Sequence, residues 1–274
     1  MVDSHPISKG LSLLDPNLLQ SFHLGSSSNL DDESLQELGV TLQRFTSLRG
    51  LALDFADNSK ISNIGLYELV SSLQTLDKLS SLHLGFSSAR SIDGPIGIIA
   101  PAIKPLVLLR SLRLDFTGHS VSHGLQLCLF SEYLQGLTAL RSLTLKFGQL
   151  RQLTDEALMD FAAALKRLTG LSTLTLDLSY LSNLTNKAIV SLSSAIGNLI
   201  KLEELSINFL GNKNLDEEGT DSLGEALKNL SSLTAISLSF KSCHLLKGDG
   251  DKFLAIFKAI SDMKFLKKVQ INLP

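Results

Sequence analysis

Apolar residues recur along this 274-residue chain in a fixed order. The pattern L-x-x-L-x-L-x-F, or a close variant of it, appears nine times, and successive copies begin about 31 residues apart. The copies begin at Leu19, Leu48, Leu79, Leu109, Leu140, Leu171, Leu202, Leu233 and Leu266. A period of this length is typical of repeat architectures, in which each unit is one small structural element.

Each copy contains two hydrophobic periods. Its fourth, sixth and eighth residues are apolar and alternate with polar ones, which predicts a strand with one buried face. Before the next copy, apolar residues recur at spacings of three and four, which predicts a helix with one apolar stripe. A clear stripe is Leu158, Phe161, Leu165 and Leu168. Thr154, Thr185 and Asp216 stand where helices would begin and are suitable N-caps.

The alternation of strands and helices predicts an α/β solenoid. One strand and one helix cannot bury their apolar faces alone, whereas stacked units share a continuous core. We expect residues 19–274 to form a horseshoe of nine β/α units, with an inner parallel sheet and outer helices. Residues 1–18 would form an N-terminal segment or a rudimentary cap. Pro95, Pro101 and Pro105 crowd the third unit, where we expect a kinked or broken helix.

These nine in-register copies resemble the leucine-rich-repeat family, and specifically its ribonuclease-inhibitor-like class with long, helix-containing repeats. The resemblance covers about residues 19–273. It implies the horseshoe fold and a non-enzymatic role in binding another macromolecule. Because the family comprises inhibitors, scaffolds, receptors and regulators, the resemblance does not imply a particular partner.

The sequence departs from the family at the ninth position of the repeat. The family places an asparagine there, whose amide bonds to neighbouring turns. In this chain the position holds Ala56, Ser87, Thr117, Gly148, Ser179, Leu210 and Lys241. We therefore expect no asparagine ladder, and instead a longer strand closed by a stack of the phenylalanines at the eighth position. The backbone groups at that corner then need other partners.

Alternate strand positions project from the concave face of the sheet, where a partner would bind. The candidate residues there are Arg110, Arg113, Asp115, Arg141, Thr144, Lys146, Asp177 and Asn208. Arginine forks onto carboxylates and favours recognition. Alternatively, neighbouring acidic and basic side chains neutralise one another across the strands. The rim loops, such as 57–60, 150–152 and 210–214, differ between copies and form an alternative binding edge.

The leading functional hypothesis is a non-enzymatic protein-interaction module or scaffold that binds a protein partner of unknown identity. One alternative is a regulator of a small GTPase, similar to activating proteins of the same class, with Arg110, Arg113 or Arg141 near the nucleotide. Another is a structural subunit of a larger assembly. The sequence stops at Pro274 directly after the ninth strand, where a solenoid needs a cap. Three explanations are open: the chain is part of something larger, a partner or a second copy covers that end, or Lys267, Lys268 and a frayed strand suffice.

Composition narrows the possible partners. The formal charge is −2, with 25 basic and 27 acidic residues dispersed along the chain, so we do not expect nucleic-acid binding. No stretch reaches the roughly 18 apolar residues of a membrane span, and we expect a soluble, cytoplasmic protein without membrane contact.

The sequence carries no catalytic or cofactor motif. His119 and His123 have the spacing of a helical metal pair, but no third ligand accompanies them, so we expect no metal and no cofactor. Cys128 and Cys243 fall in unrelated parts of the repeat and are expected to be reduced thiols, with Cys128 buried and unreactive.

Overall fold

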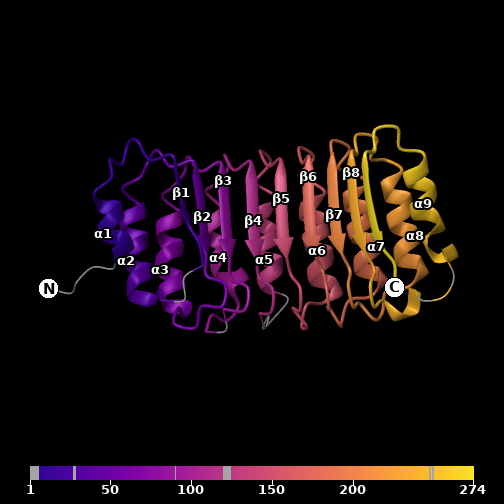
Figure 1. The fold of residues 1–274 in the computed structure, drawn as a ribbon, viewed down its shortest axis with the longest axis horizontal. Helices are drawn as coiled ribbons and strands as arrows, with labels where there is room; N and C mark the ends of the chain where they lie inside the picture. Colours follow the sequence, from indigo (N-terminus) through magenta and orange to yellow (C-terminus); the bar gives the residue numbers. More distant parts are fainter. Residues whose placement is uncertain (1–5, 27–28, 90, 120–124, 247, 249) are drawn as a thin grey trace.

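The computed structural model describes residues 6–26, 29–89, 91–119, 125–246, 248 and 250–274. Its strands form one parallel sheet in which each strand pairs with the next in chain order (Figure 1). The strands are β1 (Ser21–Leu24), β2 (Gly50–Asp54), β3 (Ser81–Gly85), β4 (Ser111–Asp115), β5 (Ser142–Lys146), β6 (Thr173–Asp177), β7 (Glu204–Asn208), β8 (Ala235–Ser239) and β9 (Lys268–Asn272). The prediction of nine β/α units is confirmed.

Helices alternate with the strands and form a second layer behind the sheet (Figure 1). They are α1 (Pro6–Ser12), α2 (Asp32–Leu42), α3 (Asn63–Leu73), α4 (Pro95–Ile103), α5 (Leu125–Leu134), α6 (Asp155–Leu165), α7 (Asn186–Ile196), α8 (Glu217–Leu227) and α9 (Leu254–Ser261). Two short 3₁₀ helices, His244–Leu246 and Gly250–Phe253, precede α9. Helix α1 and strand β9 lie toward opposite ends of the array.

The array curves, with the sheet on its inner side. In Figure 1 the row of helices spreads wider than the row of strands. Parallel strands lie about 4.8 Å apart, whereas packed helices need 8–10 Å, so stacking identical units bends the array toward the sheet. The face of the sheet turned away from the helices is therefore concave.

The predicted apolar positions form one continuous core. Leu112 and Leu114 of β4 are almost fully buried, as are the equivalent residues of the other central strands. The phenylalanines at the eighth position are buried and lie ring against ring, with centroids 6.0 Å apart for Phe86 and Phe116. The expected stack is confirmed from Phe55 to Phe147 and is interrupted at Leu178.

The helix N-termini are linked from one unit to the next. Thr154, Thr185 and Asp216 each cap their helix through a side-chain oxygen, as predicted. In α2, α3, α6 and α7 the first residue of the helix also accepts a hydrogen bond from the following unit. Asp155 Oδ1 accepts the backbone N–H of Thr185 at 2.8 Å. Asn186 Oδ1 in turn accepts the N–H of Asp216 at 3.2 Å. First-turn acids thus join neighbouring units as well as favouring their own helix.

Helix α4 differs from the expectation of a broken helix. It runs without interruption from Pro95 to Ile103, with Pro101 inside it. Pro95 occupies the first turn, where its missing N–H costs no hydrogen bond, and Gly94 enters the helix in the left-handed conformation. Burial of Ile96, Ile99 and the other apolar residues of α4 holds the helix together despite the internal proline.

The sheet's hydrogen bonding continues beyond the assigned strands. The N–H of Phe55 donates to Gly85 O, and the N–H of Asp57 donates to Ser87 O. The tenth residue of each of these loops has a positive φ, as at Asp57 (58°) and Gln149 (65°). The ladder therefore extends into the loops, although the regular strands are only five residues long.

Polar side chains at the eleventh position replace part of the family's asparagine ladder. Asn212 Nδ2 donates to Leu178 O, and Cys243 Sγ donates to Phe209 O. His119 contacts the carbonyls of Phe86 and Ile92 through its two ring nitrogens. The ninth position holds no asparagine, as expected. A mixed ladder two residues later supplies the missing partners, a solution that the sequence analysis did not predict.

Candidate functional site

The eight candidate residues lie in three parallel rows across β4, β5, β6 and β7. Arg110 and Arg141 precede β4 and β5 in equivalent positions. Arg113 and Thr144 are paired in the sheet register, in the middle of their strands. Asp115, Lys146, Asp177 and Asn208 follow one another in register at the ends of four strands. The repeat thus brings the two rows within the strands together on one face of the sheet, while Arg110 and Arg141 lie in the loops that enter β4 and β5.

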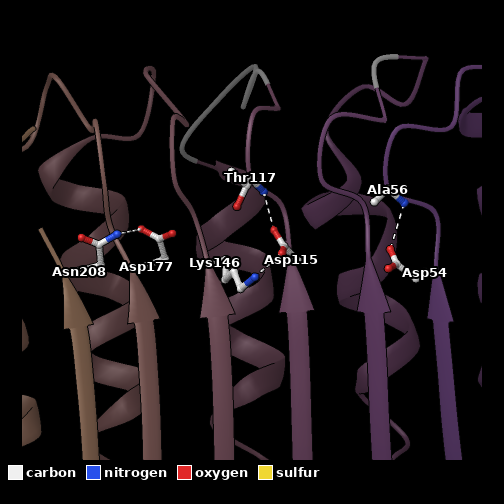
Figure 2. A network of polar contacts seen from close by, with 7 residues as sticks. All are labelled: Asp54, Ala56, Asp115, Thr117, Lys146, Asp177 and Asn208. Atoms are coloured by element: carbon white, nitrogen blue, oxygen red, sulfur yellow. Dashed lines mark hydrogen bonds and ion pairs between the residues drawn. The ribbon is translucent and has the colours of Figure 1, made fainter. Parts of the chain in front are cut away.

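The row at the strand ends is a hydrogen-bonded network, shown in Figure 2. Lys146 Nζ lies 2.7 Å from Asp115 Oδ2. Asn208 Nδ2 donates to Asp177 Oδ1 at 3.1 Å. Each pair joins side chains from adjacent strands, so the network ties neighbouring units together on the concave side.

The acidic residues of this row also bind backbone. Asp115 Oδ1 accepts the N–H of Thr117, two residues further on, at 3.1 Å. Asp177 makes the same bond to the N–H of Ser179 at 3.0 Å. The same arrangement occurs at Asp54, whose Oδ1 accepts the N–H of Ala56 (Figure 2). This side-chain turn satisfies a backbone donor at the corner where the strand ends.

Asp115 is held in its ionised form. Burial by itself raises the pKa of its carboxyl, but hydrogen bonds from Lys146 and Thr117 outweigh that effect and leave the pKa below its ordinary value. The Asp115 carboxylate is therefore ionised at neutral pH. Because Asp115 and Lys146 are both occupied, this pair supports the sheet more directly than it attracts a ligand.

The middle row places His83 beside Arg113. The two residues are paired in the register of β3 and β4. Partial burial, together with the positive charge of Arg113, lowers the pKa of His83. Arg113 itself is exposed. Aligning the fifth position of each repeat places His83 next to Arg113.

The two arginines before the strands differ in their surroundings. Arg141 Nη1 donates to the carbonyls of Ala139 and Leu140. Its guanidinium occupies the space that a side chain at Gly170 would fill. Arg110 is exposed. Arg141 is therefore partly committed to the backbone, while Arg110 and Arg113 extend into solvent.

The proposed neutralisation of charge across strands holds for one pair. The ion pairs found among the described residues join Lys146 to Asp115 and Lys228 to Glu225, and neither includes an arginine. The acidic neighbours are occupied by Lys146, Asn208 and backbone N–H groups. The arginine charges on this face are thus not matched by contacting carboxylates within the part of the chain that the structure describes.

No metal site is found in the described ranges, where no three His, Cys, Asp or Glu side chains gather around one point. His119 is buried and contacts backbone carbonyls, and His123 lies outside the described residues.

Burial raises the pKa of the Cys128 and Cys243 thiols to about 11. Cys243 is buried, but Cys128 is only half-buried, with its Sγ donating to Asp160 Oδ2, so the expectation of a buried Cys128 is wrong.

Of the helices that the structure describes, none combines the length and the apolar character needed to cross a bilayer.

The sequence matches no protein-family model and no curated protein. Its fold, however, is found among solved structures. A chain from the crystal structure of the Rad7 and Elc1 complex in yeast superimposes over 93% of this chain, with a TM-score of 0.58 and 18% identity.

The repeat, the parallel sheet and this superposition agree. The fold is that of the leucine-rich-repeat proteins. The leucine-rich-repeat chain described here spans 56% of the length of the yeast chain that it matches. Two further similar structures are the tropomodulin C-terminal domain from Caenorhabditis elegans and the leucine-rich repeat-containing protein LegL7 from Legionella pneumophila. Their identities are 14% and 13%, and their TM-scores are 0.40 and 0.44. The alignments cover 72% and 98% of this chain, and 93% and 88% of theirs.

Proposed function

We propose that this protein is a non-enzymatic interaction module that binds a protein partner on the concave face of β4 to β7. The observation that carries the proposal is a pair of exposed arginines, Arg110 just before β4 and Arg113 within it, neither of which forms an ion pair with a carboxylate of the described residues. Arginine presents a rigid fork of donors that fits carboxylates and backbone carbonyls on a partner.

The surrounding sheet suits such a role because it is already ordered. Adjacent strands bond to each other in unbroken register, and the strand-end network fixes Asp115, Lys146 and Asp177. A partner that binds here does not have to order the platform, which reduces the entropic cost of association. Thr144, in the same row as Arg113, adds a hydroxyl that both donates and accepts hydrogen bonds.

The comparison with known structures is in keeping with this role. The yeast chain of similar fold was crystallised in a complex with another protein. At 18% identity, the similarity concerns the fold and carries no partner over to this chain.

The experiment is affinity capture from lysate with a charge-reversed double variant, Arg110→Glu with Arg113→Glu. We expect it to lose, by at least about tenfold, the partners that the unchanged protein retains, because two central charges that favour binding become repulsive. Quantitative mass spectrometry of the captured proteins provides the measurement.

The matched control is Lys166→Glu with Arg167→Glu. It makes the same change of charge at exposed positions just after α6, on the helix side. Capture that is equal for the two double variants would remove the concave face as the binding surface.

A further inference from the structure

A shallow pocket opens on the rim beyond β5, β6 and β7. Its lining residues are Gln149, Arg151, Tyr180, Ser182, Gly211 and Lys213. They are the tenth and twelfth residues of three consecutive repeats. The pocket is thus built by the repeat itself, and its chemistry depends on what each copy places at these two positions.

The loop backbones hold the floor of the pocket in place. The N–H of Gln149 donates to Ser179 O, and the N–H of Tyr180 donates to Leu210 O at 2.7 Å. Asn183 Nδ2 also donates to the carbonyl of Arg151 at 2.9 Å. These bonds run between repeats, so the lining residues keep their relative positions without a ligand.

Tyr180 has an unusual conformation for an aromatic residue. Its φ is 56°, in the left-handed region, where glycine is the favoured residue. The tenth position of the fourth and seventh repeats holds glycine, at Gly118 and Gly211. The ring of Tyr180 lies over Gly211, where an added Cβ would be 2.5 Å from the ring carbon Cδ1.

The Tyr180 ring contributes little to the core. The residue is 47% exposed, and the neighbouring buried positions are filled by Leu178 and Leu181. Tyr180 is bulky, lies in an unfavourable backbone region and has about half of its surface in solvent. Core packing therefore does not explain a tyrosine at this position. Such positions often belong to binding surfaces.

The rim around this pocket is positively charged. The four rim segments 147–153, 178–184, 209–215 and 240–246 contain Arg151, Lys213 and Lys241 and no aspartate or glutamate. Neither Arg151 nor Lys213 takes part in the ion pairs of the described residues. Because they occupy equivalent positions two repeats apart, the strand spacing places their backbones roughly 10 Å from each other, with Tyr180 and Ser182 between them.

We propose that this rim pocket binds an acidic segment of a protein partner in an extended conformation. Arg151 and Lys213 receive carboxylates of the segment, and the ring of Tyr180 packs against the peptide between them. Arginine matches a carboxylate with two parallel donors, whereas lysine acts as a point charge. The inference deepens the proposed function and rests on it, because it assigns a chemistry to the partner.

An acidic peptide fits this surface better than a nucleic acid does. The cations are confined to a few loops, and the adjoining strand ends carry the carboxylates of Asp115 and Asp177. A phosphate backbone needs a continuous track of positive charge, and the chain as a whole carries a net charge of −2.

The experiment measures the binding of a fluorescein-labelled octa-glutamate peptide to the full chain by fluorescence anisotropy at low salt. We expect the double variant Arg151→Glu with Lys213→Glu to weaken binding at least about tenfold, since attraction becomes repulsion at both ends of the pocket. The matched control, Lys60→Glu with Lys78→Glu, makes the same change of charge at exposed positions in the second repeat and should bind as the unchanged chain does.

The variant Tyr180→Gly separates binding from folding. Glycine suits a φ of 56°, so the melting temperature should be unchanged or higher. Binding of the octa-glutamate peptide should nevertheless weaken severalfold, because the ring is gone. A variant with unchanged binding would remove Tyr180 from the site.

Besides unchanged binding by the rim variant, three results overturn the rim proposal. One is no binding of octa-glutamate up to about 1 mM, which corresponds to a free energy too small for a specific site. Another is tighter binding of an octathymidylate, which would identify the rim as a nucleic-acid surface. The third is loss of octa-glutamate binding in the concave variant Arg110→Glu with Arg113→Glu, which would place the peptide on the concave sheet. If the concave variant loses protein capture and still binds the peptide, both proposals are supported. If the rim variant binds octa-glutamate as the unchanged chain does, only the rim proposal fails.

Discussion

Two groups of repeats solve the same backbone problem in different ways at the eleventh position. In one group a polar side chain points into the core, as with Asn212, His119 and Cys243. In the other group the position is apolar, as with Leu150 and Leu181. All five side chains are buried, although the chemistry differs.

The difference shows that the backbone groups of one repeat can be satisfied by a side chain of the next repeat. In the fifth repeat, the N–H of Leu150 bonds to Phe147 O and closes its own turn. In the sixth repeat, Leu181 N–H instead donates to Asn212 Oδ1, while Asn212 Nδ2 donates to Leu178 O. The amide of Asn212 therefore bridges the Leu178 carbonyl and the Leu181 N–H, whose equivalents in the fifth repeat bond directly to each other. The sixth repeat, which is apolar at its eleventh position, thus depends on its polar neighbour.

The substitution Asn212→Leu removes the polar side chain on which the sixth repeat depends, and it should have the largest effect on stability among the changes at the eleventh position. It keeps the branched shape and the number of side-chain heavy atoms but leaves Leu178 O and Leu181 N–H without the bridging amide. We expect the free energy of unfolding to fall by about 2 kcal/mol, measured by urea denaturation.

The control is Asn183→Leu, which makes the same change at an exposed position where the amide bonds to a single carbonyl. Its effect should stay within about 0.5 kcal/mol. An equally small loss for Asn212→Leu would mean that the turn of the sixth repeat closes on itself, as the turn of the fifth repeat does.

The reverse substitution, Leu150→Asn, sharpens the comparison. An amide at this position is placed to reach Phe116 O, as Asn212 reaches Leu178 O two units further on. Lost apolar burial is then partly offset by a new hydrogen bond, and we expect a loss of about 1–2 kcal/mol.

A buried leucine at a different repeat position serves as the reference. Leu168→Asn lies just before the next repeat, where no eleventh-position ladder runs, and should cost about 3–5 kcal/mol. Urea denaturation of Leu150→Asn and Leu168→Asn measures the two losses in the free energy of unfolding. Equal losses would show that the eleventh position has no special capacity for an amide.

A pH-dependent effect concerns Cys243, the weakest hydrogen-bond donor of the polar group. Its thiol pKa is raised by burial to about 11, so the folded protein favours the neutral thiol more than the unfolded chain does. The resulting stabilisation is complete below the ordinary thiol pKa and is lost as the pH rises toward 11. Relative to Cys243→Ser, the unchanged protein should therefore lose stability as the pH rises from about 9 to 11.

Urea unfolding of both proteins at several pH values tests this expectation. Cys128→Ser is a partial control, since that thiol has a similarly raised pKa of about 11 but is only half-buried. A difference between the unchanged protein and Cys243→Ser that does not vary with pH would contradict a neutral buried thiol.

Much of this molecule follows from the period of its apolar residues. The positions of β4, the stripe of α6 and the N-caps at Thr154 and Thr185 all follow from local spacing, because strand and helix periods are set by backbone geometry. The same register brings six of the candidate residues together on the concave face, namely Arg113, Asp115, Thr144, Lys146, Asp177 and Asn208. Stacking in register makes residues about 31 positions apart neighbours in space.

The partners of individual polar groups did not follow from that period. The sequence analysis treated Asp115 and Asp177 as candidates for binding, and the structure adds a backbone role for each at the strand end. His119 was weighed as part of a metal pair, yet it is buried against carbonyls of the preceding repeat. Which of several nearby acceptors a side chain reaches depends on local distances and angles.

The sequence by itself therefore determined the repeat, the layers and the face that each residue occupies. Only the tertiary structure decided which charges remain available, such as Arg113 and Arg151, and which are already used, such as Lys146. The physical reason is that burial of apolar surface is non-directional and responds to a coarse pattern. Hydrogen bonds and ion pairs are short-ranged and directional, so they depend on the assembled geometry of neighbouring repeats.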